Sequence, residues 1–223
     1  MSAVPNPALA AGAAPELAFS VLEATAAKYT AVPTLVFALR IERAGGGGVR
    51  SVLLDAQVQI AARRRPYGEA DQAWLVELFG TPDRWGTTLR TLLWTRTTLV
   101  VPPFTDSTEV ELSIPCSYDL QVSASSYFSA LEDGDVPLEF LFSGSVFYSG
   151  PGGMLQTVRL SWEKEAEYRL PVALWREAMD RHFPGAAWLR LDRGAFDRLR
   201  TYKAEHGLMS WDAAIDRLVG EGG

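Results

Sequence analysis

The sequence predicts an α+β fold: an antiparallel β-sandwich of about seven strands with an inserted helix and a C-terminal helical segment. Through most of residues 15–165, apolar and polar side chains alternate with the period of two that half-buried strands show. After Trp162 the apolar side chains follow helical spacing and charged residues become denser. Strands in one run and helices in another are typical of an α+β protein and not of a parallel sheet.

Seven segments carry the strand pattern. The first three are residues 17–21, 35–41 and 52–60, and the glycines Gly45–Gly48 predict a loose hairpin loop between the second and the third. The longest alternation covers residues 110–122. Pro115 interrupts it, so we expect an edge position, a bulge or a bend there. The remaining strands are expected at 92–101, 138–148 and 155–162.

Helices are predicted in three places. Residues 69–79 have helical spacing and stop at Gly80, which gives a helical insertion near 69–90. A short helical turn is expected at 126–131. Beyond Pro171, one helix extends to Phe183, a second begins at the cap Asp192, and a third at the cap Ser210. The predicted organisation is a flexible tail (1–14), the sandwich (15–165) and a helical segment (166–223) packed on it.

Composition excludes several classes of protein. The chain has 21 basic and 27 acidic residues and a net charge of −6, which argues against a nucleic-acid binder. One cysteine cannot form an internal disulfide, and the first 15 residues lack the pattern of a secretion signal. No apolar run is long enough to cross a bilayer. We therefore expect a cytoplasmic protein that binds neither nucleic acid nor membranes.

The residue types that carry most enzyme chemistry are scarce. Cys116 shares the apolar face of its strand, which predicts a buried and unreactive thiol. His182 and His206 each stand at the end of a predicted helix and have no second metal ligand at a suitable spacing. Residues 132–135 (Glu-Asp-Gly-Asp) fit a turn, with a Ca²⁺ or Mg²⁺ site as the open alternative. We predict no catalytic, cofactor-binding or metal-binding residue and no cofactor.

A protein-binding surface is the strongest functional signal. The arginine cluster before Pro66 is either a solvated strand end or a docking point for an acidic partner. In strand 138–148 apolar side chains lie on both faces, so either a helix or a partner covers the outer one. The residues that we expect in such an interface are Arg63, Arg64, Arg65, Trp85, Leu141 and Phe147.

Several phrases resemble an actinobacterial family, a domain of unknown function. Among them are LFGTPDRWGTTLRTLLWT, VPLEFLFSGSVFY and EYRLPVALWREAMDRHFP, and the resemblance spans about residues 15–220. Members of that family are often encoded beside nickel–iron uptake hydrogenase genes. The resemblance implies an accessory or assembly role, with a hydrogenase subunit or maturation factor as the partner, and it defines no catalytic residues.

The tail has a second, shorter resemblance. Phe183-Pro184, followed by Leu189, Leu191 and Phe196, resembles the C-terminal part of SecB-type export chaperones. The resemblance implies a chaperone-like role and covers about 20 residues. The predicted helix after Ser210 and the insertion at 63–90 depart from that pattern.

Two functional hypotheses follow. The first is a non-enzymatic interaction protein that acts as an accessory, assembly or chaperone-like factor, with homo-oligomerisation possible. The alternative is an enzyme or small-ligand-binding protein with a pocket between the sandwich and the helical cap. Exposed apolar surface would favour the first, and a cleft with converging acids or arginines would favour the second.

Overall fold

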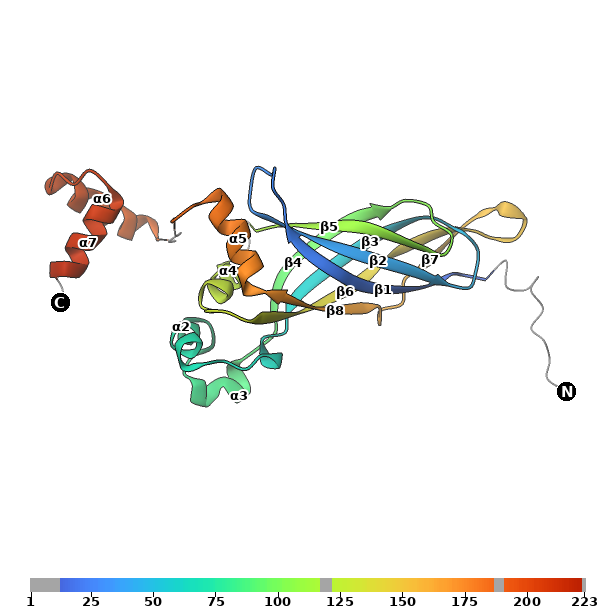
Figure 1. Ribbon diagram of the computed structural model, residues 1–223, viewed down its shortest axis with the longest axis horizontal. Helices are drawn as coiled ribbons and strands as arrows, with labels where there is room; N and C mark the ends of the chain where they lie inside the picture. Colours follow the sequence, from blue (N-terminus) through green and yellow to red (C-terminus); the bar gives the residue numbers. More distant parts are fainter. Residues whose placement is uncertain (1–12, 117–121, 187–190, 222–223) are drawn as a thin grey trace. The chain divides into compact units, whose positions relative to one another are not determined.

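A computed structural model describes residues 13–116, 122–186 and 191–221 of the chain. The chain forms two compact units, Met1–Gly185 (unit 1) and Ala186–Gly223 (unit 2). Unit 1 contains two antiparallel sheets and the helices α2 to α5, and unit 2 contains the helices α6 and α7 (Figure 1). The predicted α+β class with an antiparallel sandwich is confirmed.

Eight strands in the described residues make up the two sheets. Sheet A has the order β1-β2-β5, and sheet B has the order β4-β3-β6-β7, with β8 also paired to β6. All strand pairs are antiparallel. The strands are β1 (Glu16–Ala26), β2 (Thr34–Ala44), β3 (Val49–Ile60), β4 (Leu92–Val101), β5 (Ser107–Pro115), β6 (Asp135–Ser149), β7 (Leu155–Arg159) and β8 (Glu165–Pro171).

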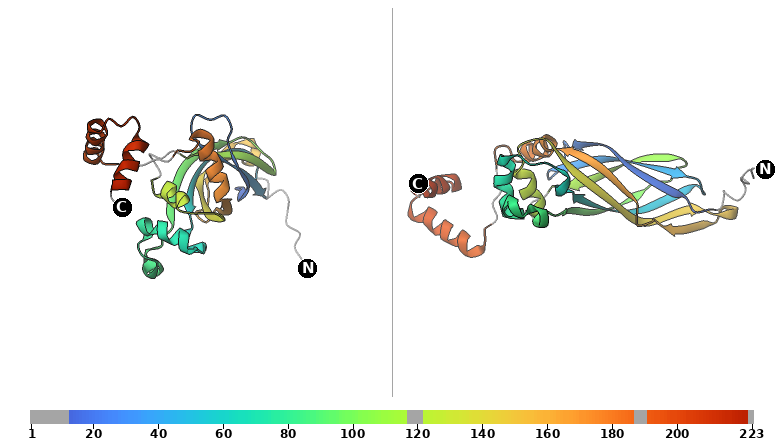
Figure 2. Two further views of the ribbon diagram at one scale, coloured as in Figure 1. Left: turned by 60° about the vertical axis from the view of Figure 1, so that its left-hand side comes forward. Right: turned by 90° about the horizontal axis from the view of Figure 1, so that it is seen from below.

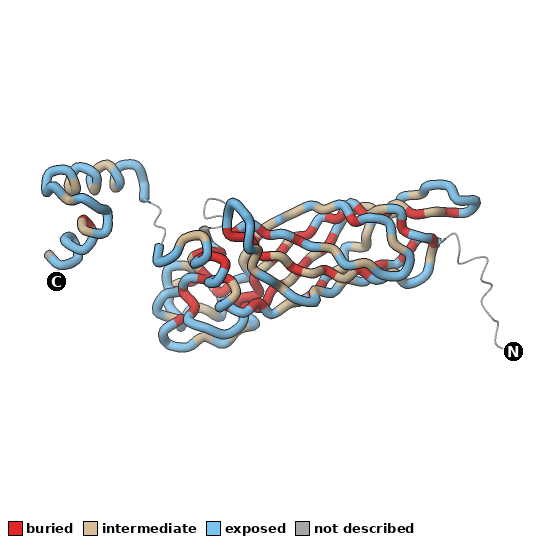
Figure 3. Tube along the Cα trace, turned by 45° about the horizontal axis from the view of Figure 1, so that its top comes forward, coloured by how far each residue is buried: buried red, intermediate tan, exposed pale blue. Residues whose placement is uncertain are grey.

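The core lies between the two sheets and extends under the helices at one end. Alternate residues of each strand point inward, so buried and exposed positions alternate along the strands in Figure 3. Phe37 of β2 is fully buried, and its ring contacts those of Trp94, Phe140 and Tyr168, which come from three strands of sheet B. Aromatic edge-to-face contacts therefore join the two sheets.

The glycines Gly45–Gly48 do not form a hairpin, so that prediction is wrong. β2 pairs with β1 and β5, whereas β3 pairs with β4 and β6, and the loop between them crosses from sheet A to sheet B. A Cβ on Gly47 would lie 2.0 Å from the carbonyl oxygen of Ser149. Glycine is therefore needed here for the close approach of this loop to the end of β6, and not for a tight turn between paired strands.

The long strand predicted at 110–122 ends earlier than expected. β5 stops at Pro115, whose partner Thr34 is the first residue of β2. The next residue, Cys116, still donates its backbone N–H to the carbonyl of Pro33 at 2.7 Å. Residues 117–121 of the predicted strand lie outside the described residues, and α4 (Val122–Ser129) begins directly after them.

The edge of sheet B beside β6 is built from two short strands. β8 pairs with Asp135–Leu141 and β7 pairs with Ser145–Ser149. Residues 160–164 lie between them, still attached to β6 by backbone hydrogen bonds from Leu160 N to Gly144 O and from Phe142 N to Lys164 O. Within this interruption Trp162 is 91% exposed.

The helices of unit 1 gather at one end of the sandwich (Figure 2). They are α2 (Glu69–Phe79), the short α3 (Trp85–Thr88), α4 and α5 (Val172–His182). The predicted C-terminal helical segment begins at residue 166, but residues 166–171 belong to β8 (Glu165–Pro171) of sheet B, and the predicted helix that follows, α5, packs against β1, β2 and β8. The first compact unit therefore ends at Gly185 and not at residue 165.

Unit 2 is a pair of helices, α6 (Arg193–Glu205) and α7 (Trp211–Glu221). The two predicted caps are confirmed: Asp192 Oδ1 accepts from Ala195 N at 2.7 Å, and Ser210 Oγ accepts from Ala213 N at 3.0 Å. The apolar residues Trp188, Leu189 and Leu191 predict a brief extended piece before α6, and of these three only Leu191 is among the described residues.

Candidate protein-interaction face

The outer face of sheet B carries large apolar side chains that point away from the core. Leu53 of β3 lies opposite Val100 of β4 and opposite Ser145 of β6. Leu53 is 43% exposed and Val100 is 69% exposed. In Figures 1 and 2 the described helices of unit 1 lie at the end of the sandwich and not across this face. Within unit 1, these side chains therefore meet solvent.

Two further residues extend this apolar row across the sheet. Phe147 of β6 lies opposite Ser51, two residues from Leu53 on the same face, and Leu155 of β7 lies opposite Ser149, two residues from Phe147. Such diagonal neighbours are within reach of an aromatic side chain. Phe147 is half-buried and Leu155 is exposed. We call Val100, Leu53, Phe147 and Leu155 the apolar band.

The same face is charged nearer to the helices. Arg64 reaches over it and forms ion pairs with Glu167 of β8 at 2.6 Å and with Glu139 of β6 at 3.3 Å. The hydrogen bond to Glu167 and the two carboxylates raise the pKa of the Arg64 guanidinium. Leu141 of β6 is half-buried on this face, opposite Gln57 and Glu165.

Arg63 and Trp85 lie at the insertion and not on the sheet. The Arg63 guanidinium donates to the carbonyls of Leu89 at 2.6 Å and of Gly86 at 3.2 Å. The indole of Trp85 is half-buried, contacts Tyr67 and donates its Nε1–H to the carbonyl of Gly80 at 2.7 Å. Both side chains therefore hold the insertion together.

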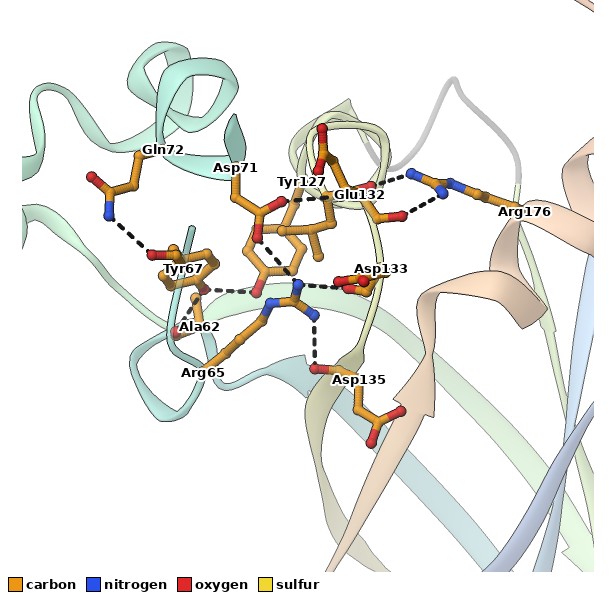
Figure 4. A network of polar contacts seen from close by, with 11 residues as sticks. Ala62, Arg65, Tyr67, Asp71, Gln72, Tyr127, Glu132, Asp133, Asp135 and Arg176 are labelled. Atoms are coloured by element: carbon orange, nitrogen blue, oxygen red, sulfur yellow. Dashed lines mark hydrogen bonds and ion pairs between the residues drawn. The ribbon is translucent and has the colours of Figure 1, made fainter. Parts of the chain in front are cut away.

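Arg65 is the centre of a buried polar network (Figure 4). Its guanidinium pairs with Asp71 Oδ2 at 3.2 Å and donates to the carbonyls of Asp133 at 2.6 Å and Asp135 at 3.0 Å. The other oxygen of Asp71 accepts from the backbone N–H of Glu132 at 3.0 Å. This network fastens helix α2 to the turn that precedes β6, so the Arg65 side chain is unavailable to a partner.

Two tyrosine hydroxyls complete the attachment of the insertion. Tyr67 donates to the carbonyl of Ala62 at 2.7 Å, and its oxygen lies 2.7 Å from the hydroxyl of the fully buried Tyr127. Burial raises the pKa of both hydroxyls, and for Tyr127 the neighbouring Tyr67 raises it further. Both tyrosines therefore stay protonated and act as hydrogen-bonding groups between the insertion and α4.

The six predicted interface residues thus fall into two groups. Arg64, Leu141 and Phe147 share the outer face of sheet B, whereas Arg63, Arg65 and Trp85 hold the insertion in place. Sequence reasoning missed the most exposed members of the apolar band. Their signal was present, because the pairs Leu53-Leu54 and Val100-Val101 each put apolar side chains on both faces of a strand. The members that were missed are Leu53, Val100 and Leu155.

The cysteine and the two histidines have structural environments. Cys116 is buried, as predicted, and burial raises the pKa of its thiol to about 12. His182 is in the last turn of α5, where its two ring nitrogens lie 3.0 Å from the carbonyl of Ala178 and 2.9 Å from that of Thr30. His206 caps the end of α6, with Nδ1 2.9 Å from the carbonyl of Tyr202.

Residues 132–135 form the predicted turn. Gly134 has φ +76°, a conformation that favours glycine, and its carbonyl accepts from the N–H of Val172 at 2.8 Å. In the described part of the chain, no three side chains of His, Cys, Asp or Glu come close enough to hold a metal ion.

A pocket of about 300 Å³ lies at the other end of the sandwich from the helices of unit 1. Arg50 lines it, and its Nε donates to the hydroxyl of Ser149 at 2.7 Å. The position of this pocket differs from that of the ligand pocket proposed from the sequence, which would lie between the sandwich and the helical cap. The lining residues are Gly48, Val49, Arg50, Pro103, Phe104, Thr105 and Ser149.

None of the described helices has the length and apolar character that a membrane crossing requires.

The fold and its exposed band define a class of protein: an antiparallel β-sandwich with an apolar band on one outer sheet face. Residues 14–222 match the model of a family described as "Family of unknown function (DUF6084)", and the chain belongs to this family. No curated protein matches the chain.

Some solved structures align with the chain. One is the CARDB domain of the PF1109 protein from Pyrococcus furiosus, in complex with di-metal ions, with 10% identity and a TM-score of 0.28. That alignment covers 70% of this chain and 91% of the domain. Another is β-glucosidase 3B from Thermotoga neapolitana in complex with glucose, with 19% identity and a TM-score of 0.27 over 70% of this chain and 17% of the enzyme. With such low scores, neither alignment supports an argument about this protein.

Proposed function

We propose that the protein is a non-enzymatic interaction module whose outer face of sheet B binds a partner protein. The apolar band carries the proposal. Val100, Leu53 and Leu155 are exposed, and together with the half-buried Phe147 they occupy four consecutive strands of sheet B in the order β4-β3-β6-β7. Contiguous apolar surface of this kind marks protein-binding sites.

On the same face Asp55, two residues from Leu53 along β3, accepts a hydrogen bond from the hydroxyl of Thr98, and the Arg64 ion pairs lie further along the sheet. Polar groups thus follow the band, as in the rim of an interface.

The partner class comes from the family resemblance. A subunit or maturation factor of a nickel–iron hydrogenase, in a cytoplasmic and actinobacterial setting, is the partner that we propose. In that setting the module acts as an accessory, assembly or chaperone-like factor. A rigid sheet face suits such a role because little ordering entropy is lost when it binds.

Co-purification from the native host tests this proposal. The tagged chain, a Leu53→Lys/Val100→Lys variant and a Leu22→Lys control are purified and the co-eluting proteins identified by mass spectrometry. Leu22 is a sound control because it is 43% exposed, like Leu53, but lies in sheet A. We expect a stoichiometric hydrogenase subunit or maturation factor with the wild type and with the control, and at least a tenfold loss with the double variant. Elution of the wild type alone, or equal recovery with the double variant, would refute the proposal.

A second candidate is the binding of a small anion in the pocket beside Arg50. The guanidinium of Arg50 and the hydroxyls of Thr105 and Ser149 supply donors at its wall. Calorimetric titration with phosphate and with citrate, repeated with Arg50→Gln, tests it. Heat of binding that disappears in the variant would support a ligand site, and no heat with either anion would remove it.

A further inference from the structure

Unit 2 leaves its apolar side chains largely uncovered. Of its described residues only Ala214 is buried, while Phe196 of α6 and Trp211, Ile215 and Leu218 of α7 are each about 40% exposed. Trp211, Ile215 and Leu218 are spaced at i, i+4 and i+7, so they form one stripe along α7. The Phe196 ring lies 5.5 Å from that of Trp211 and continues the stripe onto α6.

Helices of this size are not stable by themselves. α6 has 13 residues and α7 has 11, near or below the length at which an isolated helix is marginal in water. A pair with one buried alanine gains little from the hydrophobic effect. Ordering of unit 2 therefore requires something to cover the stripe.

The charges of unit 2 indicate what covers the stripe. Over residues 193–205, α6 carries four basic and two acidic side chains, whereas residues 211–220 of α7 carry two acidic and one basic. The stripe is thus bordered by a basic helix on one side and an acidic helix on the other. A surface of this kind is complementary to itself, because a twofold axis can set α6 of one copy against α7 of the other.

The distribution of net charge along the chain favours the same site. Residues 186–223 contain six basic and six acidic residues, so the net charge of −6 belongs entirely to residues 1–185. Two copies of unit 1 repel one another, but two copies of unit 2 do not.

We propose that two copies of the chain associate through the stripe formed by Phe196, Trp211, Ile215 and Leu218, with α6 of each copy facing α7 of the other. This association is separate from the binding of another protein at sheet B. The buried stripe supplies the affinity, and the opposite charges of the two helices select the pairing.

A charge-swapped pair of variants tests the pairing in the full chain. One variant carries Arg198→Glu/Arg200→Glu and the other Asp212→Lys/Asp216→Lys. In each, α6 and the partner's α7 then have charges of the same sign. By sedimentation over a concentration series we expect the wild type at twice the mass of one chain and each variant at the mass of one chain. An equimolar mixture should return to twice that mass, which also shows that both variants are folded.

A second pair of variants tests the stripe itself. Ile215→Lys is expected to lower the association constant at least tenfold, whereas Tyr29→Lys, an equally drastic change at a fully exposed residue of unit 1, is expected to leave it unchanged. Circular dichroism checks that α7 remains helical in Ile215→Lys. The proposal would be overturned if the wild type stays at the mass of one chain, and also if it stays at that mass and binds a different protein through the stripe. A mixture of charge-swapped variants that stays dissociated while both keep their helices would overturn it as well. Neither outcome bears on the sheet B proposal, whose variants lie in unit 1.

Discussion

The two units of the chain differ sharply in how they use their apolar residues. Apart from Ala214, every buried apolar residue in the described chain belongs to unit 1. Within unit 1 each strand has a paired neighbour in its sheet and a second sheet opposite, whereas unit 2 consists of two helices that pack on each other. An amphipathic pattern therefore states which side of an element turns away from water, but not whether anything lies on that side.

The largest expected effect is in the core of unit 1. Phe37→Ala removes a fully buried ring that joins both sheets, so we expect a loss of about 3–5 kcal/mol in the free energy of unfolding. Urea denaturation followed by tryptophan fluorescence measures it. The matched change in unit 2, Phe196→Ala, removes a ring that is more than one-third exposed and should cost well under half as much. Equal losses would contradict the difference between the units.

The buried ion pair of unit 1 comes next. Asp71→Ala leaves the Arg65 guanidinium buried without its carboxylate, and we expect a loss of about 3 kcal/mol. The matched control is Glu109→Ala, which breaks an ion pair with Arg40 in which both side chains are about half exposed and should cost less than about 1 kcal/mol. Thermal unfolding of both variants provides the comparison, and a small loss in Asp71→Ala would mean that the network does not hold the insertion.

The single cysteine, Cys116, lies in the core of unit 1, so alkaline pH tests the burial of that core with a smaller effect on stability. The Cys116 thiol has an ordinary pKa of 9.0 when unfolded and one of about 12 when folded. The folded state therefore holds the thiol proton to a higher pH than the unfolded state. The stability that this group contributes is complete below pH 9 and falls as pH rises towards 12. We expect the advantage of the wild type over Cys116→Ala to shrink by about 1.4 kcal/mol per pH unit in that window.

Urea denaturation of both proteins at pH 8, 9 and 10 measures this difference in the free energy of unfolding. The raised pKa values of Tyr67 and Tyr127 also reduce the stability of the folded chain in alkali. Both tyrosines are present in both proteins, so their contributions cancel in the difference. A difference that does not change with pH would show that the thiol is reached by solvent in the folded state.

The smallest effect is expected in unit 2. Ser210→Ala removes the side chain that caps α7, and we expect a loss of about 1 kcal/mol confined to that unit. Hydrogen exchange should speed up in α6 and α7 and stay unchanged in the strands of unit 1. Faster exchange in both units would mean that the two unfold together.

Much of the fold was predictable from local pattern. The period of two located the strands, and the caps Asp192 and Ser210 located two helix starts, because each signal depends on a few neighbouring residues. The pairing of strands was not predictable in the same way. Four glycines suit a hairpin, and nothing nearby reveals that β2 and β3 lie in different sheets. The neighbours of β2 are β1 and β5, and those of β3 are β4 and β6.

The candidate site was predictable in part for the same reason. Phe147 and Leu141 were found because their strand is apolar on both faces, and the same rule applied to Leu53-Leu54 would have found another member of the band. The arginine cluster shows the limit of composition. Arg63, Arg64 and Arg65 are consecutive, yet one holds carbonyls of the insertion, one pairs with glutamates on the sheet and one is buried with Asp71. Only the folded backbone separates these three roles.

The crossing from sheet A to sheet B at Gly45–Gly48 also has a consequence for folding during synthesis. β4 follows β3 in the chain and can pair with it first, whereas the other edge of β3 pairs with β6, whose residue Tyr148 lies opposite Val49. Contacts so distant in sequence close slowly, because the loop entropy is lost before the pairing is gained. The edge of β3 is therefore open while the intervening residues are made, and β6 is half-paired until β8 follows at residues 165–171. We expect a chain that stops before Glu165 to leave residues 135–141 of β6 unpaired on one edge and to aggregate more readily, whereas one that stops at Gly185 has all eight strands.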